Sequence, residues 1–168
     1  LKKRVSDAIK IASKYGIKEV YMMGRDEAYG EKLTAQKSAW TVVHEAGGRI
    51  WCAGYEENLR EMKGLQDLLN RSGSPKKELA EQAHAVGCQV CSYGNPFAGV
   101  ENPEVHRRNY GLLLWRLGYD GIFNYVYQHS AGYNGWNDFD DQKMRDLNYT
   151  YSTVNGVIDT IAWEGLRE

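Results

Sequence analysis

The chain has 168 residues, enough for one domain with a sizeable core but fewer than the ~200 that a complete (β/α)8 barrel normally needs. Lys and Arg number 21 against 22 Asp and Glu, and a net charge of -1 excludes the basic field that would attract nucleic acid or an anionic membrane surface. No apolar run approaches the ~20 residues of a membrane span, so a small neutral partner fits this composition best.

Both ends of the sequence are predicted to be cut. The sequence begins at Leu1 without a methionine and stops at Glu168 inside a predicted helix start. No signal peptide precedes the first helix, but one lost upstream would leave this same sequence. The compartment is therefore open, with export or a periplasmic location among the options.

Four amphipathic segments each end in a glycine suited to the left-handed conformation, and an extended run follows each glycine. The glycines are Gly16, Gly47, Gly87 and Gly118. They recur at intervals of roughly 30 to 40 residues, the length of a βα module. Strands are accordingly predicted over 18–23, 50–53, 89–93 and 121–127, with a further short strand over 65–69.

Apolar residues at helical spacing predict helices between these strands. A helix over 31–46 would bury Leu33, Trp40 and Val43 on one face, and a short helix is predicted over 57–63. Two later helices are expected to begin with a capping side chain followed by a proline. These starts are Ser74-Pro75 and Asn102-Pro103, and the second helix has the apolar stripe Tyr110, Leu113, Leu114 and Leu117.

Strands that alternate with helices predict parallel pairing, because a helical crossover is needed to return to the same sheet edge. A doubly wound open sheet and a barrel both satisfy this pattern. No glycine-rich dinucleotide fingerprint and no phosphate loop follows a predicted strand, which favours the barrel. The predicted fold is α/β, a partial (β/α) TIM-type barrel of about five parallel strands, in which residues 1–168 form a single domain and the carboxyl-terminal portion of the barrel.

Two of the three cysteines, Cys88 and Cys91, have C-x-x-C spacing. They lie along a predicted strand, where side chains three apart point to opposite faces. They are therefore predicted to be buried structural thiols, joined neither by a disulfide nor by zinc. No metal or other cofactor is expected.

The active site of a barrel is built from residues at the carboxyl ends of its strands and from the loops that follow. Aromatic and amide side chains dominate these positions, which suits a carbohydrate because flat rings cover sugar faces and polar groups bind hydroxyls. The predicted substrate-binding residues are Tyr55, Tyr93, Asn95, Tyr125, Tyr127, His129, Trp136 and Asp138. Tyr93 and Tyr125 are equally compatible with filling the barrel interior.

Asp26 and Glu27 are the candidate catalytic residues because they follow the first predicted strand closely. The backbone turns at a strand end, so both carboxyl groups can enter one pocket. Their mutual repulsion would separate their pKa values and leave one carboxyl able to act as a general acid. The alternative is a solvated pair that opens the following helix, since acids suit a helix amino terminus.

Five stretches of the sequence resemble the carboxyl-terminal half of barrels related to glycoside hydrolase family 123. They are residues 21–28, 40–48, 93–96, 136–140 and 161–168. The resemblance implies substrate-assisted hydrolysis of a terminal 2-acetamido sugar, a β-N-acetylhexosaminide. Asp26 would orient the acetamido group and stabilise an oxazolinium intermediate, and Glu27 would protonate the leaving oxygen and then activate water. A proline often follows the pair in such barrels, whereas Ala28 stands here.

The alternative function is that of a non-catalytic fragment of a degenerate barrel, which binds glycans or serves in assembly. Five strands cut from a closed barrel would leave two open edges and an uncovered apolar inner face. Besides a carbohydrate substrate, we therefore expect a partner that covers these surfaces. Either a second copy in a homodimer or the missing amino-terminal half of the barrel would do so.

Overall fold

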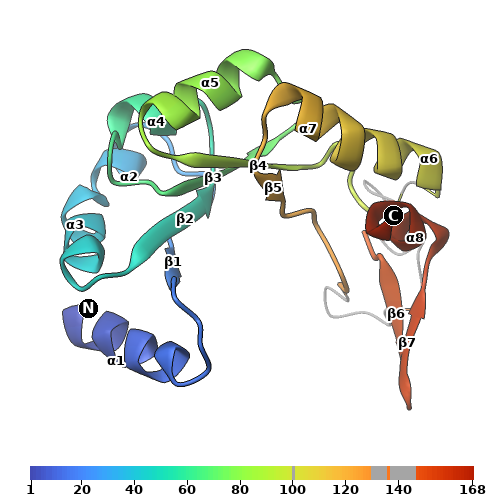
Figure 1. Cartoon of the computed structure of the whole chain (residues 1–168), viewed down its shortest axis with the longest axis horizontal. Coiled ribbons are helices and arrows are strands. Elements are labelled where there is room, and N and C mark those ends of the chain that lie inside the picture. Colours follow the sequence, from blue (N-terminus) through green and yellow to red (C-terminus); the bar gives the residue numbers. More distant parts are fainter. Residues whose placement is uncertain (100, 130–135, 137–146) are drawn as a thin grey trace. The chain divides into compact units, whose positions relative to one another are not determined.

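A computed structural model describes residues 1–99, 101–129, 136 and 147–168. Its main sheet has five parallel strands in the order β1-β2-β3-β4-β5, so each strand lies beside its neighbour in sequence (Figure 1). A doubly wound sheet would instead reverse its order at a switch point. The predicted fold class is confirmed, since parallel strands alternate with helices as in a partial TIM-type α/β barrel.

The strands of this sheet are β1 (Tyr21–Met23), β2 (Arg49–Ala53), β3 (Leu68–Ser72), β4 (Gln89–Tyr93) and β5 (Gly121–Ile122). The helices are α1 (Lys2–Ser13), α2 (Gly30–Thr34), α3 (Lys37–Glu45), α4 (Glu57–Glu61), α5 (Lys77–Ala85), α6 (Pro103–His106), the π-helix η1 (Arg107–Leu113), α7 (Leu114–Leu117) and α8 (Ile161–Arg167). An antiparallel hairpin of β6 (Thr150–Thr153) and β7 (Gly156–Asp159) completes the set. None of the helices in the described ranges is long and apolar enough to cross a membrane.

The chain divides into two compact units. Unit 1 comprises Leu1–Arg71 and Lys76–Cys91, and unit 2 comprises Ser72–Pro75 and Ser92–Glu168. The single domain over residues 1–168 stays a prediction.

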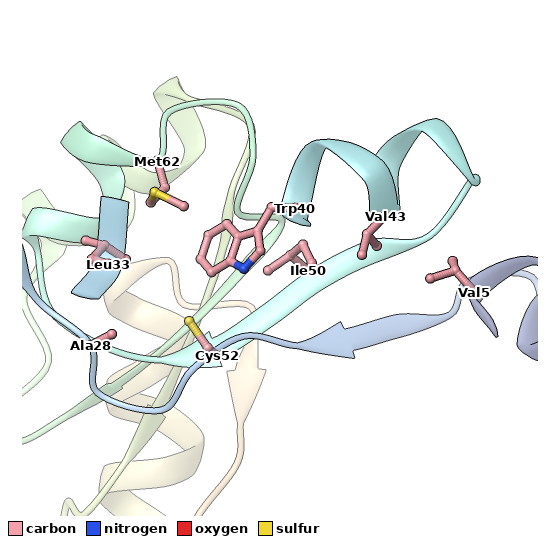
Figure 2. Packing of buried hydrophobic residues seen from close by; sticks show 8 residues of the cluster. All are labelled: Val5, Ala28, Leu33, Trp40, Val43, Ile50, Cys52 and Met62. Carbon is pink, nitrogen blue, oxygen red and sulfur yellow. The ribbon is translucent and has the colours of Figure 1, made fainter. Parts of the chain in front are cut away.

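Unit 1 is built around a core between the strands and the helices that cover one side of them. Figure 2 shows the Trp40 ring of α3 beside Ile50 and Cys52 of β2, and all three side chains are buried. The full core cluster is Val5, Ala28, Leu33, Trp40, Val43, Ile50, Cys52 and Met62. The predicted stripe of the region 31–46 therefore faces the sheet.

Unit 2 contains a continuous helical stretch, α6-η1-α7, against which α8 packs closely. At Gly165 of α8 an added Cβ would lie 2.3 Å from the carbonyl oxygen of Pro103, so only glycine allows this approach. A buried cluster of Ala98, Tyr149 and Ala162 lies next to this contact. The unit therefore depends on close backbone packing.

The four junction glycines adopt left-handed φ angles of +75°, +85°, +75° and +77°, which confirms the prediction of helix-ending glycines. The cap at Asn102 is also confirmed, since its Oδ1 accepts the N–H of Val105 at 3.3 Å with Pro103 at the first helical position. Of the apolar stripe predicted to follow, Tyr110 and Leu114 are buried.

Two predicted helix boundaries are wrong. The region 31–46 forms two helices, α2 and α3, with a turn at Ala35 and Gln36 between them, and the Gln36 side chain in this turn accepts the N–H of Arg25. Ser74-Pro75 does not open α5, since Lys76 is still extended and the helix begins only at Lys77.

Two predicted strands are also shifted. The strand expected over 121–127 ends at Ile122, because the following segment leaves β4 and pairs elsewhere. The N–H of Val126 donates to the carbonyl of Leu147 at 3.0 Å, and the Val126 carbonyl accepts from Tyr149 at 3.1 Å. The strand expected over 65–69 is β3, which lies three residues later.

Candidate functional site

Asp26 and Glu27 lie in the loop that follows β1, and both side chains are exposed. The backbone of this loop continues to pair with β2 beyond the end of β1. The N–H of Gly24 donates to the carbonyl of Trp51 at 2.8 Å, and the N–H of Glu27 donates to the carbonyl of Ala53 at 3.0 Å. The position of the carboxylate pair is therefore set by the register of two parallel strands.

Side chains from two helices hold the same loop. The N–H of Arg25 donates to Oε1 of Gln36 at 2.6 Å, and the N–H of Gly30 donates to Oε1 of Glu57 at 3.1 Å. Ala28 is buried in the core between these two anchors. The loop that carries the candidate catalytic pair is thus held at both ends and in the middle.

The pair does not open a helix, because α2 begins three residues later at Gly30. The prediction that the pair would open the following helix is therefore wrong, although both side chains are exposed, as expected of solvated acids. Burial raises the pKa of Asp26, and the charge of Glu27 raises it further. The backbone of Glu27 has a φ of +46°, a left-handed conformation that a non-glycine residue seldom adopts.

A buried polar cluster positions Tyr55 in the turn after β2. The N–H of Tyr55 donates to Oδ1 of Asn58 at 3.2 Å, and Nδ2 of Asn58 donates to Oε1 of Gln66 at 3.0 Å. Both amide side chains are buried, and Gln66 also donates to the carbonyl of Leu68 at 3.1 Å. A Cβ at Gly54 would lie 2.6 Å from Asn58, so this turn requires glycine.

The end of β3 brings an arginine to the same edge of the sheet. The N–H of Gly54 donates to the carbonyl of Asn70 at 3.1 Å, which places the next residues, Tyr55 and Arg71, side by side. The guanidinium carbon of Arg71 lies over the Tyr55 ring, 5.9 Å from its centroid. The ring of Tyr29 meets Tyr55 edge to face, with centroids 6.3 Å apart. Two carboxylates, two rings and a guanidinium therefore lie at or just after the carboxyl ends of three adjacent strands.

Tyr93 is the last residue of β4 and Asn95 follows the strand, and both belong to unit 2. The Tyr93 ring contacts Phe97 with centroids 6.0 Å apart. The N–H of Asn95 donates to Oη of Tyr110 at 2.7 Å, and Nδ2 of Asn109 donates to the carbonyl of Asn95 at 3.2 Å. Two consecutive residues of the π-helix thus hold the turn after β4.

Tyr125, Tyr127 and His129 follow β5 in unit 2, and all three are exposed. Tyr125 contacts His129, with ring centroids 5.7 Å apart. Tyr127 meets Trp163 edge to face at 5.4 Å. Alternate residues of this segment therefore take part in different ring contacts, and Trp163 packs as a support for Tyr127.

Trp136 stacks on Tyr151 of the hairpin, with ring centroids 5.3 Å apart, and its Nε1 donates to the carbonyl of Ser152 at 3.0 Å. The indole therefore packs against β6 through these two contacts. Asp138 lies outside the described residues.

A network of polar side chains supports this part of unit 2. Oδ1 of Asn124 accepts the N–H of Gly94 at 2.8 Å, and its Nδ2 donates to the carbonyl of Pro96 at 3.0 Å and to Oη of Tyr149. Oη of Tyr149 also lies 3.1 Å from Nδ1 of the buried His106. Burial raises the pKa of Tyr149 to about 12, so the hydroxyl keeps its proton and can take part in both bonds.

All three cysteines are buried and form no disulfide. This confirms the prediction that Cys88 and Cys91 are buried thiols that are not joined to each other. Burial, together with the charge of Asp26, raises the pKa of the Cys52 thiol to about 12, so this thiol is a poor nucleophile. Among the described residues, no three His, Cys, Asp or Glu side chains gather in a way that could hold a metal ion.

Sequence reasoning missed three residues of this edge. Arg71 was visible as a strand-end residue but had no assigned role. Gln36 precedes α3 and Glu57 begins α4, and their contacts with the loop after β1 depend on tertiary packing that no local pattern reveals.

No protein-family model matches the sequence, and no curated protein matches it either. Among solved structures, the chain is similar to a truncated form of 3-deoxy-D-arabino-heptulosonate 7-phosphate synthase from Thermotoga maritima, with a TM-score of 0.49 and 10% sequence identity over 89% of this chain. The chain spans 53% of that protein. At this identity the similarity says nothing of activity, and the fold assignment depends on the strand order.

Proposed function

We propose that this chain is part of a (β/α)-barrel glycoside hydrolase that resembles family 123 and removes a terminal 2-acetamido sugar, a β-N-acetylhexosaminide. The observation that supports this function best is the Asp26-Glu27 pair at the carboxyl end of β1. It is fixed by the bond from the Glu27 N–H to the Ala53 carbonyl, 3.0 Å long. In a barrel, this end of the strands carries the catalytic groups.

In the proposed reaction, the substrate supplies the nucleophile. The ionised carboxylate of Asp26 accepts a hydrogen bond from the acetamido N–H, and the acetamido oxygen attacks the anomeric carbon. Glu27 gives its proton to the leaving glycosidic oxygen, so an oxazolinium forms as the alcohol departs. Glu27 then takes a proton from water, which opens the oxazolinium and restores both carboxyl groups.

The surroundings of the pair suit a sugar. Tyr29 follows Glu27 after one buried residue, and its ring is 62% exposed beside Tyr55, which is 37% exposed. Perpendicular rings of this kind offer an apolar face to a pyranose and a hydroxyl to its polar edge. Partial withdrawal of its carboxyl from water and the charge of Glu27 raise the pKa of Asp26. The division of roles between the two carboxyls is taken from the family resemblance.

The test is hydrolysis of aryl 2-acetamido glycosides by Glu27→Gln. We expect a loss of ~10²-fold or more with a poor leaving group, because a general acid typically contributes that much. The loss should be smaller with an activated aryl group, whose oxygen needs less protonation. Glu31→Gln is the matched control, since this exposed acid lies four residues later in α2 and should leave turnover unchanged.

Equal losses on activated and unactivated substrates would contradict the acid role of Glu27. Substrate assistance has its own test, because replacing the 2-acetamido group of the substrate with a hydroxyl should abolish turnover. Full activity on the 2-hydroxy sugar would instead demand a protein nucleophile.

A non-catalytic glycan-binding module is the second candidate. It is favoured by the exposed rings of unit 2, where Tyr125 and Tyr127 are 43% and 47% exposed. Binding of a 2-acetamido sugar without hydrolysis, lost in Tyr127→Ala and retained in Glu27→Gln, would select this candidate. The homodimer stays a prediction that sedimentation at micromolar concentration can test.

A further inference from the structure

We infer that the edge formed by Tyr29, Tyr55 and Arg71 recognises an anionic group, so that the substrate is a 2-acetamido glycan carrying a sulfate or carboxylate. This inference rests on the proposed function and names its substrate class. It is carried by the guanidinium of Arg71 over the Tyr55 ring at the carboxyl end of β3.

Backbone bonds fix the place of Arg71 relative to the carboxylate pair. The carbonyl of Ala53 accepts from Glu27 at 3.0 Å, and the N–H of the next residue, Gly54, donates to Asn70 at 3.1 Å. Three consecutive strand ends are therefore locked in register. The carboxylates follow the first strand, Tyr55 follows the second, and Arg71 is the penultimate residue of the third.

The spacing of the strands separates the positive from the negative charge. Neighbouring strands lie ~4.8 Å apart, so β1 and β3 are separated by about 10 Å with Tyr55 between them. A ligand that spans this distance can place its acetamido group at Asp26 and a second, anionic group at Arg71. At about 10 Å, repulsion between that anion and the carboxylates is largely screened by physiological salt.

The chemistry of the guanidinium favours an oxyanion over a neutral hydroxyl. Its central carbon lies over the Tyr55 ring, 5.9 Å from the ring centroid. The N–H donors of a guanidinium form a planar fork that matches two oxygens of a carboxylate or sulfate. The nearby carboxylate of Glu56 lies 3.7 Å from Nζ of Lys76, so that ammonium offsets its charge.

Tyr55 gives this arrangement rigidity. Its N–H is held by Asn58, which is itself held by the buried Gln66. A ring with a fixed backbone restricts the rotamers of the arginine above it, so less conformational entropy is lost when an anion binds.

The experiment compares three probes with the wild-type chain and with Arg71→Gln. The probes are a neutral aryl 2-acetamido glycoside, its 6-O-sulfated counterpart, and a disaccharide in which the 2-acetamido sugar is linked to a uronic acid. Dissociation constants are measured by calorimetry with Glu27→Gln as the background, and kcat/KM with Glu27 intact. We expect Arg71→Gln to weaken an anionic probe by ~10-fold or more while changing the neutral probe little, because hydrogen bonds to charged groups contribute that much.

Two controls separate recognition from folding. Arg60→Gln removes an exposed arginine of α4 in the same unit and should change none of the probes. Arg71→Lys keeps the charge without the planar fork and should recover only part of the affinity. Preference for the sulfated probe alone, or for the uronic acid alone, identifies the source of the anion.

Equal binding of anionic and neutral probes by the wild-type chain would overturn the inference, and so would equal losses for both in Arg71→Gln. If the neutral glycoside is still hydrolysed with dependence on Glu27, the proposed function survives that failure. If anionic probes bind through Arg71 but nothing is hydrolysed, the anion subsite stands and the hydrolase proposal fails.

Discussion

The two units hold their strand-end loops by different means. In unit 1 the loops after β1 and β2 are extensions of the parallel ladder, with backbone bonds from Glu27 to Ala53 and from Gly54 to Asn70. In unit 2 the turn after β4 is held by the side chains of Asn124 and Tyr110. Strand register places the groups of unit 1 with support from the side chains of Gln36, Glu57 and Asn58. In unit 2 the backbone ladder does not continue into this turn, which depends on particular polar residues and on close backbone packing.

The largest expected effect of a single change is at the contact of α8 with α6. Gly165→Ala would place a Cβ 2.3 Å from the Pro103 carbonyl oxygen and 2.5 Å from its Cα, and neither backbone atom can move without shifting a helix. We expect a loss of ~3 kcal/mol or more in the free energy of unfolding, at the upper end for overpacking. Denaturant titration followed by far-ultraviolet circular dichroism measures it.

Gly111→Ala is the matched control in the same unit, because a Cβ at that helical position meets nothing within 4 Å. Here alanine should stabilise by ~0.5–1 kcal/mol through its better helix propensity. If the two alanine variants have equal stabilities, α8 does not pack against α6 as described.

The second prediction sharpens the comparison of side-chain with backbone support. Asn124→Ala removes three hydrogen bonds, to Gly94, Pro96 and Tyr149, and should cost ~2 kcal/mol. Gln36→Ala in unit 1 removes two bonds, one from the Arg25 N–H and an exposed one to the Lys32 carbonyl, and should cost ~1 kcal/mol or less because the ladder still holds that loop. Thermal unfolding measures the loss of stability in each variant. A larger loss in Gln36→Ala than in Asn124→Ala would contradict the view that unit 2 depends more on side-chain hydrogen bonds than unit 1 does.

The third prediction concerns alkaline pH. Burial raises the pKa of Cys52 in unit 1 from 9.0 to about 12 and that of Tyr149 in unit 2 from 10.0 to about 12. Each group keeps its proton to a higher pH in the folded chain than in the unfolded chain. The free energy of unfolding is therefore independent of this group below the ordinary pKa and falls as the pH rises from there towards the folded pKa. Unit 1 should begin to lose stability above pH 9, and unit 2 only above pH 10.

Melting temperatures measured from pH 7 to 11 test this order. In Cys52→Ala the melting temperature should no longer fall between pH 9 and 10, because the titrating thiol is gone. It should be lower than that of the wild type at every pH, because the substitution leaves a cavity. An unchanged slope between pH 9 and 10 in that variant would show that the thiol is not the titrating group.

The sequence predicted unit 1 well because its signals are local. Glycines such as Gly47 end helices where a left-handed residue is required, and the apolar stripe of Trp40 and Val43 defines the buried face. Strand ends then follow, and with them the placement of Asp26 and Glu27. The break between α2 and α3 was not predicted, and neither was the bond that the Arg25 N–H donates to Gln36, because it depends on tertiary packing.

Unit 2 was predicted less well because its order depends on distant partners. The segment after β5 has an apolar and aromatic pattern typical of a strand, yet Val126 pairs with Leu147 and Tyr149 and not with β4. The hairpin of β6 and β7 did leave a signal, since the two-residue loop Val154-Asn155 is followed by Gly156. The ring contacts of the unit, such as Tyr127 with Trp163, depend on tertiary packing and have no local signature.

The smallest expected effect concerns Asp26 and connects the stability of unit 1 with its proposed chemistry. Burial and the charge of Glu27 raise the pKa of Asp26 above its ordinary 3.8, so the folded chain binds this proton more tightly than the unfolded chain does. The free energy of unfolding therefore falls as pH rises through the window just above 3.8, and at neutral pH the ionised Asp26 opposes folding.

Asp26→Asn should consequently raise the melting temperature slightly at pH 7 and leave it unchanged at pH 3, where the wild-type carboxyl is protonated. The same variant should lose turnover, because an amide cannot stabilise the oxazolinium as an anion does. Asp7→Asn, on the exposed side of α1, is the control and should show no such pH dependence. A carboxylate kept at a cost in stability is typical of a functional site, since selection for folding alone would replace it. Equal melting temperatures of Asp26→Asn and wild type at pH 7 would remove this argument and leave the pair as an ordinary exposed loop.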